Sequence, residues 1–156
     1  MNHSSVGVAR SAILVLLVSC TSDNGLSLPA PPPGYPTAYA TAACAPFDGP
    51  ATQLFLAAEP AEALPPPAPF IEVAIWRGVM SLSGRRVEWA GASSDGMARR
   101  CDPAGACVEA TKVAVQFRPV GADTTVTGVA ALRFTDGSTV TGGFNAAWRH
   151  SPLMCG

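Results

Sequence analysis

The stretch VTGVAALRFTDGSTVTGGFNAAW, Val126–Trp148, decides the expected fold of this chain. Apolar and small residues alternate with polar ones on both sides of residues 135–137, which have the composition of a tight turn. A two-residue turn would give the two strands opposite buried faces, which a half-buried sheet does not allow. A three-residue loop with Gly137 in the left-handed conformation instead places Leu132 opposite Val140. The sequence therefore predicts a β-hairpin in this register.

The two faces of this hairpin differ in character. The face expected to be buried carries Val126, Gly128, Ala130, Leu132, Phe134, Val140, Gly142, Phe144, Ala146 and Trp148. The opposite face carries Thr125, Thr127, Arg133, Thr139, Thr141, Asn145 and Arg149. Threonine is a good strand former, so this second face is interpreted as a solvated sheet surface, with a flat binding plane as the alternative.

Further strands are expected on both sides of a proline-rich loop, Glu59–Pro69. Residues 71–75, 86–89 and 112–118 alternate between apolar and polar positions, which is typical of half-buried antiparallel strands. Gly and Pro interrupt the apolar runs about every ten residues, and no segment has convincing helical periodicity. The sequence predicts an all-β domain, a small antiparallel β sandwich or barrel.

Four cysteines follow residue 40: Cys44, Cys101, Cys107 and Cys155. An even number in an exported protein indicates two disulfides, with three possible pairings. The residues DPAGA between Cys101 and Cys107 favour a turn, so these two are expected to pair, and Cys44 and Cys155 pair by elimination. The alternative is a zinc site of four thiolates, which the lack of a C-x-x-C pair disfavours.

The segment SAILVLLVSC, Ser11–Cys20, indicates where in the cell the protein is expected to be located. Its apolar run is far shorter than the roughly 20 residues of a bilayer-spanning helix and has the length of a signal-peptide core. Residues 17–20, LVSC, resemble the lipobox of bacterial lipoproteins. That resemblance implies removal of residues 1–19 and acylation of Cys20 with palmitate-type chains, which anchor the protein to a membrane. The alternative is an ordinary secretory signal in which Cys20 is incidental.

Residues 20–43 are expected to form the lipidated N-terminus and a disordered linker, and residues 44–156 a single domain. The linker is rich in Pro, Ala and Thr, and it has too few large aliphatic side chains to fold alone. Thr21 follows Cys20 where the resemblance would place Asp in a protein retained at the inner membrane. The resemblance therefore implies the cell outer membrane, on either its periplasmic or its surface face.

Composition excludes some classes of partner and gives no sign of a cofactor. Ten Lys and Arg balance eleven Asp and Glu, for a net charge of −1, and no basic stripe is present. Nucleic acid is therefore not an expected partner, nor does a polybasic patch indicate recognition of lipid headgroups. No phosphate loop, dinucleotide fingerprint, calcium loop or metal site is found. The expected partners are the membrane, through the lipid anchor, and an envelope protein or glycan.

Residues suited to chemistry are few, and no catalytic residue is assigned. His150 lacks a recognisable carboxylate partner, and Ser94 lacks the strand and helix of a nucleophile elbow. Trp76 is interpreted as a core residue, with a stacking surface as the alternative if its face is open. Arg99 and Arg100 are interpreted as solvated loop residues, with an anion site as the alternative. The sequence favours a non-enzymatic structural or partner-binding domain. The alternative is an envelope hydrolase or carbohydrate-binding accessory domain that uses the Trp76 face.

Overall fold

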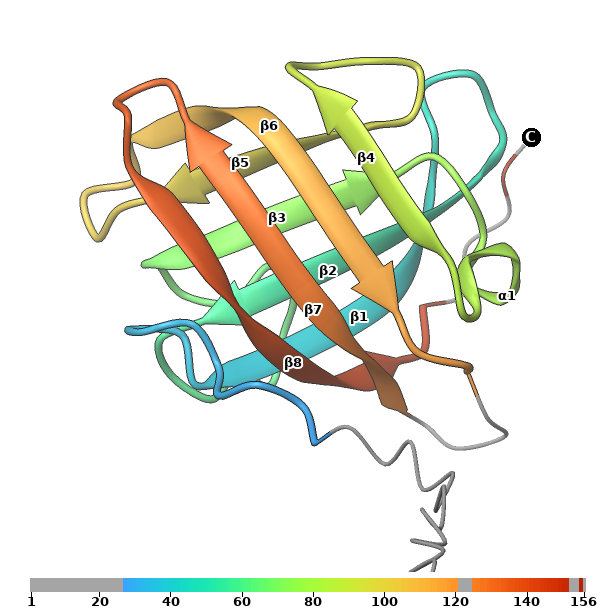
Figure 1. The fold of residues 1–156 in the computed structure, drawn as a ribbon, viewed down its shortest axis with the longest axis horizontal. Coiled ribbons are helices and arrows are strands. Elements are labelled where there is room, and N and C mark those ends of the chain that lie inside the picture. The colour runs from blue at the N-terminus through green and yellow to red at the C-terminus, as the bar shows by residue number, and fades with distance from the viewer. Residues whose placement is uncertain (1–26, 121–124, 152–154, 156) are drawn as a thin grey trace, which may run out of the picture.

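The computed structural model describes residues 27–120, 125–151 and 155. The apolar run and the lipobox lie outside these residues. A single helical turn, α1 (Val79–Leu82), precedes the fourth strand. The strands are β1 Thr37–Cys44, β2 Pro50–Ala57, β3 Phe70–Ile75, β4 Arg86–Ala90, β5 Gly96–Cys101, β6 Cys107–Phe117, β7 Thr125–Phe134 and β8 Thr139–Arg149 (Figure 1).

Seven of these strands close into a barrel, in the order β1-β2-β3-β5-β6-β7-β8, and β4 is an extra strand paired with β6. All neighbouring pairs are antiparallel except β8 and β1, which run parallel over Tyr39–Thr41. The parallel pair has a simple cause, because a closed ring with an odd number of strands cannot alternate in direction throughout. The predicted all-β class is confirmed, and the architecture is the barrel.

The β7–β8 hairpin has the predicted register. Leu132 lies opposite Val140, and Gly137 adopts the left-handed conformation with φ of 83°. The Gly137 N–H donates to the Phe134 carbonyl at 3.0 Å, and the Phe134 N–H donates to the Ser138 carbonyl at 2.9 Å. Both apolar sets therefore point to the same side, into the barrel.

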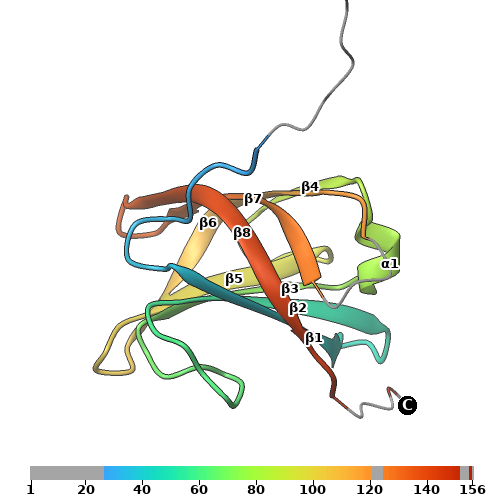
Figure 2. The ribbon, with the colours of Figure 1, turned by 90° about the horizontal axis from the view of Figure 1, so that it is seen from below.

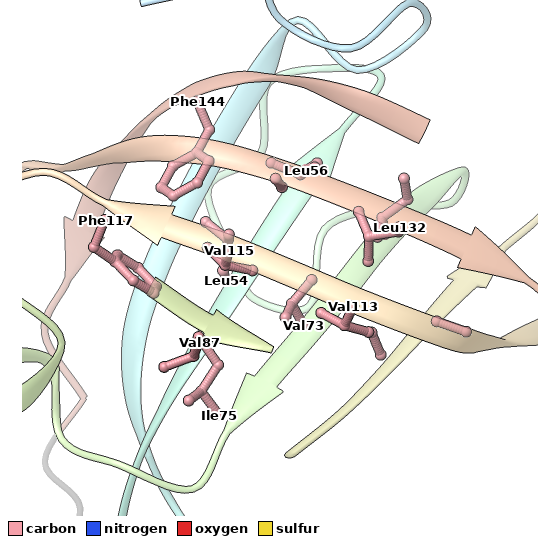
Figure 3. Packing of buried hydrophobic residues seen from close by; sticks show 14 of the residues in the cluster. Leu54, Leu56, Val73, Ile75, Val87, Val113, Val115, Phe117, Leu132 and Phe144 are labelled. Atoms are coloured by element: carbon pink, nitrogen blue, oxygen red, sulfur yellow. The ribbon is translucent and has the colours of Figure 1, made fainter. Parts of the chain in front are cut away.

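Apolar side chains from all eight strands fill the interior, where β1 and β5 contribute the small Ala40 and Ala98 (Figure 3). The rings of Phe117 and Phe144 meet edge to face at 5.9 Å between centroids. Gly128 lies against them: a Cβ there would come within 2.3 Å of the Gln116 carbonyl oxygen and 2.6 Å of the Phe144 ring. The interior is therefore closely packed where β6, β7 and β8 meet.

The folded region begins before Cys44, so the expected domain boundary is wrong. Residues 37–43, predicted as linker, belong to β1, which ends at Cys44 and lies between β2 and β8, where Tyr39 and Ala40 are buried. Small Ala and Thr residues carry little apolar area, yet they fit a strand whose neighbours supply the large side chains. The composition was therefore a poor guide to order in this segment.

The preceding residues are also held on the barrel. Pro32 and Gly34 (φ 83°) form a turn closed by the Tyr35 N–H, which donates to the Pro32 carbonyl at 3.0 Å. The Tyr35 side chain packs on the main core. Ala30 accepts a hydrogen bond from the Gly143 N–H at 2.9 Å, which continues the edge of β8 beyond its short pairing with β1. We call residues 29–35 the N-terminal segment.

Both expected disulfides are present. Cys44 is bonded to Cys155, and Cys101 is bonded to Cys107 across the β5–β6 turn. The first joins the end of β1 to the C-terminal residues, 111 positions away in sequence. Covalent closure therefore reinforces the barrel where β1 meets the chain leaving β8.

The proline-rich loop lies outside regular structure, as predicted, and it folds back on the outer surface of the barrel. Leu64, Ala61 and Ala68 of the loop pack on a second apolar cluster. That cluster consists of Tyr39, Phe55, Ala57, Phe70 and Cys101. The loop thus covers part of the outer face of β1, β2, β3 and β5, and every residue of β3, between β2 and β5, is buried.

Candidate functional site: an outer pocket above Glu72

A pocket of about 800 Å³ opens on the outer face of β1, β2, β3 and β5, between the proline-rich loop and the end of β8. The loop contributes Glu62, Leu64 and Pro65. The last two residues of β8 and the two that follow contribute residues 148–151. The volume is within the range of small-ligand sites. Polar and charged side chains line it together with apolar ones, and it is the candidate site.

The floor of the pocket is a network built around Glu72. Glu72 is only 6% exposed. Gln53 Nε2 donates to Oε1 at 3.0 Å, and Arg99 Nε donates to Oε2 at 2.8 Å. Arg99 Nη2 also forms an ion pair with Oε2 at 2.8 Å. Strand register explains the contact with Arg99, because Glu72 and Arg99 are directly opposite on β3 and β5. The buried charge is thereby neutralised and its acceptor oxygens are occupied.

One wall is held in place by polar contacts between the loop and β8. The Tyr39 hydroxyl accepts a hydrogen bond from the Ala61 N–H at 2.7 Å. Arg149 lies over the Tyr39 ring at 5.1 Å and donates to the Ala61 carbonyl at 3.3 Å. Thr41 Oγ1 donates to the Arg149 carbonyl at 2.8 Å. The loop is therefore tied to the barrel at its rim and the pocket is preformed.

The lining combines hydrogen-bonding groups with apolar surface from Phe55, Leu64 and Trp148. Its two carboxylates, Glu62 and Glu72, balance its two guanidinium groups, Arg99 and Arg149. Such a lining suits an uncharged polar ligand better than a strongly charged one.

His150 also lines this pocket and is exposed. Among the described residues, no carboxylate forms a hydrogen bond or ion pair with its ring. The arrangement of a histidine base oriented by a carboxylate is thus not found in the part of the chain that the structure describes.

Trp76 does not line the pocket. It is half-buried directly after β3, its indole N–H donates to the Ser93 carbonyl at 3.1 Å, and its backbone N–H donates to the Asp95 carbonyl at 2.9 Å. These contacts fix the ring to the β4–β5 loop. Trp76, interpreted from the sequence as core with a stacking surface as the alternative, is thus half-buried and holds that loop, which also carries the exposed Ser94.

Arg99 and Arg100 do not form a joint anion site. The sequence suggested a loop, but both belong to β5, where successive side chains point to opposite faces. Arg99 lies in the outer pocket. Arg100 lies at one end of the barrel, 4.9 Å from the Phe134 ring, and donates to Ser138 Oγ at 2.8 Å and Asp136 Oδ2 at 2.6 Å.

Sequence reasoning assigned no role to Glu72, Gln53 or Arg149. One signal was present: Glu72 interrupts the apolar strand FIEVAI, and a carboxylate in such a strand is costly unless it is paired. Its partners come from strands far away in sequence, so the pocket itself was not visible in the pattern.

No protein-family model matches the chain, and no curated protein or solved structure shows significant similarity to it. Within the described residues, the structure contains no helix of the length and apolar character needed to span a membrane. Nor do three or more His, Cys, Asp or Glu side chains gather there as a metal site. Inference about function therefore depends on the residues themselves.

Proposed function

We propose that this chain is a lipid-anchored protein of the bacterial cell envelope whose barrel binds a partner and performs no catalysis. The observation that carries the proposal is the pairing of the segment SAILVLLVSC, ending at Cys20, with a domain closed by two disulfides. Disulfides form and persist in the compartments that an export signal leads to. The two features thus both support a location outside the cytoplasm, in the cell envelope.

The anchor is tested by mass spectrometry of the protein extracted from membranes with detergent. We expect the mature chain to begin at Cys20 and to carry the mass of a diacylglyceryl group and a further acyl chain. The Cys20→Ser variant is expected to lose these masses and to leave the membrane fraction. Loss of the short disulfide, by Cys101→Ala with Cys107→Ala, is the control and should leave acylation unchanged. A free thiol at Cys20 in the wild-type protein contradicts the proposal.

We propose that the partner is a protein, and that an extended, uncharged segment of its polypeptide binds in the outer pocket. The balanced charges, the polar floor and the apolar rim of Leu64 and Pro65 support this assignment. A photo-crosslinking amino acid at Leu64 is expected to give a discrete cross-linked species in intact cells, and the same group at the exposed Ser94 is the control.

The product at Leu64 should disappear when Gln53→Ala and Arg149→Ala are combined, because both side chains line the pocket. Products of equal yield from positions 64 and 94, or a product at 64 unaffected by the pocket substitutions, would contradict this assignment. Adducts to glycan without any polypeptide would favour the carbohydrate-binding alternative.

A further inference from the structure

The second hollow of the barrel lies on the opposite side from the outer pocket, on the outer face of β4, β6, β7 and β8. It is shallow, with a volume of about 520 Å³. Ala114 and Ala131, which are directly opposite on β6 and β7, line it together with Thr141 of β8. We call the surface of Arg86, Glu88, Lys112, Ala114, Ala131, Arg133, Thr139 and Thr141 the alanine face.

The alanine face is positively charged although the chain as a whole has a net charge of −1. Its charged residues are three cations and one carboxylate, and Arg86 forms an ion pair with that carboxylate, Glu88. Lys112 and Arg133 are directly opposite each other on β6 and β7, both exposed. Neither forms an ion pair with a described residue.

Like charges directly opposite in a sheet destabilise the pair. An anion from outside the barrel would neutralise both charges and remove this repulsion. On the opposite side, the proline-rich loop carries Glu59 and Glu62 and no Lys or Arg, and the charges that line the outer pocket balance. The alanine face is therefore the more cationic of the two sides.

The path of the chain indicates which anion meets the alanine face. The N-terminal segment crosses the edge of β8, where a Cβ on Gly143 would come within 2.2 Å of the Pro29 carbonyl oxygen. Gly143 shares the outer face with Val129, its partner on β7. In Figure 2 the described chain begins, in blue, outside the layer of β4, β6, β7 and β8, while the loop between β2 and β3 lies beyond the other layer.

Ser27, the first described residue, is seven positions after Cys20. A chain of that length spans at most about 25 Å. The expected linker ending at Cys44 would have allowed a far greater distance. An acylated Cys20 would therefore be confined to within about 25 Å of Ser27, where the described chain begins outside the layer of β4, β6, β7 and β8.

We infer that the alanine face lies against an anionic bilayer surface, with Lys112 and Arg133 in contact with lipid headgroups, and that the outer pocket faces away from the membrane. The inference rests on the proposed anchor at Cys20. Each cation near an anionic membrane surface favours binding by about fivefold. Two cations therefore increase the preference for this orientation about 25-fold. The lipid anchor already holds the barrel at the bilayer, so the cations need only orient it.

The experiment uses the acylated protein, extracted from membranes and reconstituted into phosphatidylcholine vesicles with one third phosphatidylglycerol and a small fraction of headgroup-nitroxide lipid. A fluorescent amino acid is placed at Thr141, on the alanine face, or at Glu62, on the opposite side. We expect quenching at position 141 to exceed that at position 62 several-fold. Raising the salt concentration should reduce the difference.

Charge variants supply the controls. Lys112→Gln with Arg133→Gln is expected to bring the two quenching values together, whereas Lys112→Arg with Arg133→Lys keeps both charges and should preserve the difference. Arg77→Gln removes a cation from elsewhere and should also preserve it.

The anchor and the orientation fail in distinguishable ways. Protein that does not float with the vesicles would overturn the anchor and the orientation together. Protein that floats but is quenched equally at both positions, or more at 62, would overturn the orientation alone.

Discussion

Glu72 is the only charged side chain that is buried among the described residues, and two donated hydrogen bonds and an ion pair hold its carboxylate. The value of this network depends on burial. A buried ion pair is costly to break because one charge is left without a partner, whereas exposed pairs contribute little. Arg99 retains 41% exposure of its side chain, so water can partly replace Glu72 as its partner.

Replacing Glu72 by Gln is therefore expected to lower the free energy of unfolding by about 1–2 kcal/mol, less than for a fully buried pair. The control is Asp95→Asn, which breaks the ion pair with Arg77, where both side chains are close to half exposed. That change should cost less than about 0.5 kcal/mol. Urea denaturation of the oxidised protein measures both, and equal losses would show that the Glu72 network has no special role.

Asp136 illustrates how a turn sets the pKa of a single group. The Ser138 hydroxyl and backbone N–H both donate to its carboxylate, and Arg100 adds a weaker attraction, so the pKa of Asp136 is lowered below its usual value. A carboxyl whose folded pKa is lowered stabilises the protein above its unfolded pKa. That contribution is lost as the pH falls through the folded pKa.

The substitution Ser138→Ala should therefore raise the pKa of Asp136 toward the ordinary range, because it removes the largest cause of the shift. Arg100→Gln should raise it by less. An NMR titration of the side-chain carboxyl carbon measures both shifts. An unchanged pKa in Ser138→Ala would contradict the assignment of the hydroxyl as the main cause.

At the scale of elements, the N-terminal segment is the feature that sequence composition misrepresents. Its residues are those of a flexible linker, yet Tyr35 packs on the core and the Gly143 N–H uses Ala30 as its acceptor. Partial burial raises the pKa of the Tyr35 phenol, an effect that nearby Arg100 opposes. The segment therefore behaves as part of the barrel.

Tyr35→Ala is expected to lower the free energy of unfolding by about 2 kcal/mol, the value of a partly buried aromatic side chain. Phe47 offers a matched control because it is an aromatic residue that is 62% exposed. Phe47→Ala should change stability by less than about 0.5 kcal/mol. If residues 21–43 were a linker throughout, the two variants would be indistinguishable in thermal or urea unfolding.

At the scale of the whole molecule, the two disulfides close loops of very different length. Cys44 and Cys155 are separated by 111 positions, and Cys101 and Cys107 by 6. The loop-entropy model assigns about 4–5 kcal/mol to the long loop and about 2 kcal/mol to the short one, because a longer loop restricts the unfolded chain more.

We therefore expect Cys44→Ala with Cys155→Ala to destabilise the protein more than Cys101→Ala with Cys107→Ala. The difference should be about 2–3 kcal/mol, from denaturation midpoints measured on otherwise oxidised protein. Only three residue pairs join β1 to β8, so the barrel is weakly closed at this seam. Loss of the Cys44–Cys155 bridge beside the seam is then again expected to destabilise the protein more than loss of the short bridge. A larger loss from the short bridge would contradict both accounts.

Local patterns in the amino-acid sequence predicted much of the fold. Alternation, turn chemistry and cysteine spacing predicted the strands of the last hairpin, its register at Leu132 and Val140, and both disulfides. Each of these depends on residues close in sequence or on elimination among a few choices. Strand faces follow from the period of two, which the sequence displays directly.

The remainder was decided by contacts between distant segments. β1 is ordered by β2 and β8, and the outer pocket exists because Gln53, Glu72 and Arg99 meet across three strands. The amino-acid sequence by itself determined the all-β class, the hairpin register and the cysteine pairs, because local physics sets these. Only the tertiary structure decided that a linker-like segment is a strand, and that one face is cationic beside the emerging chain. A residue's burial and charge environment depend on neighbours that the linear order does not reveal.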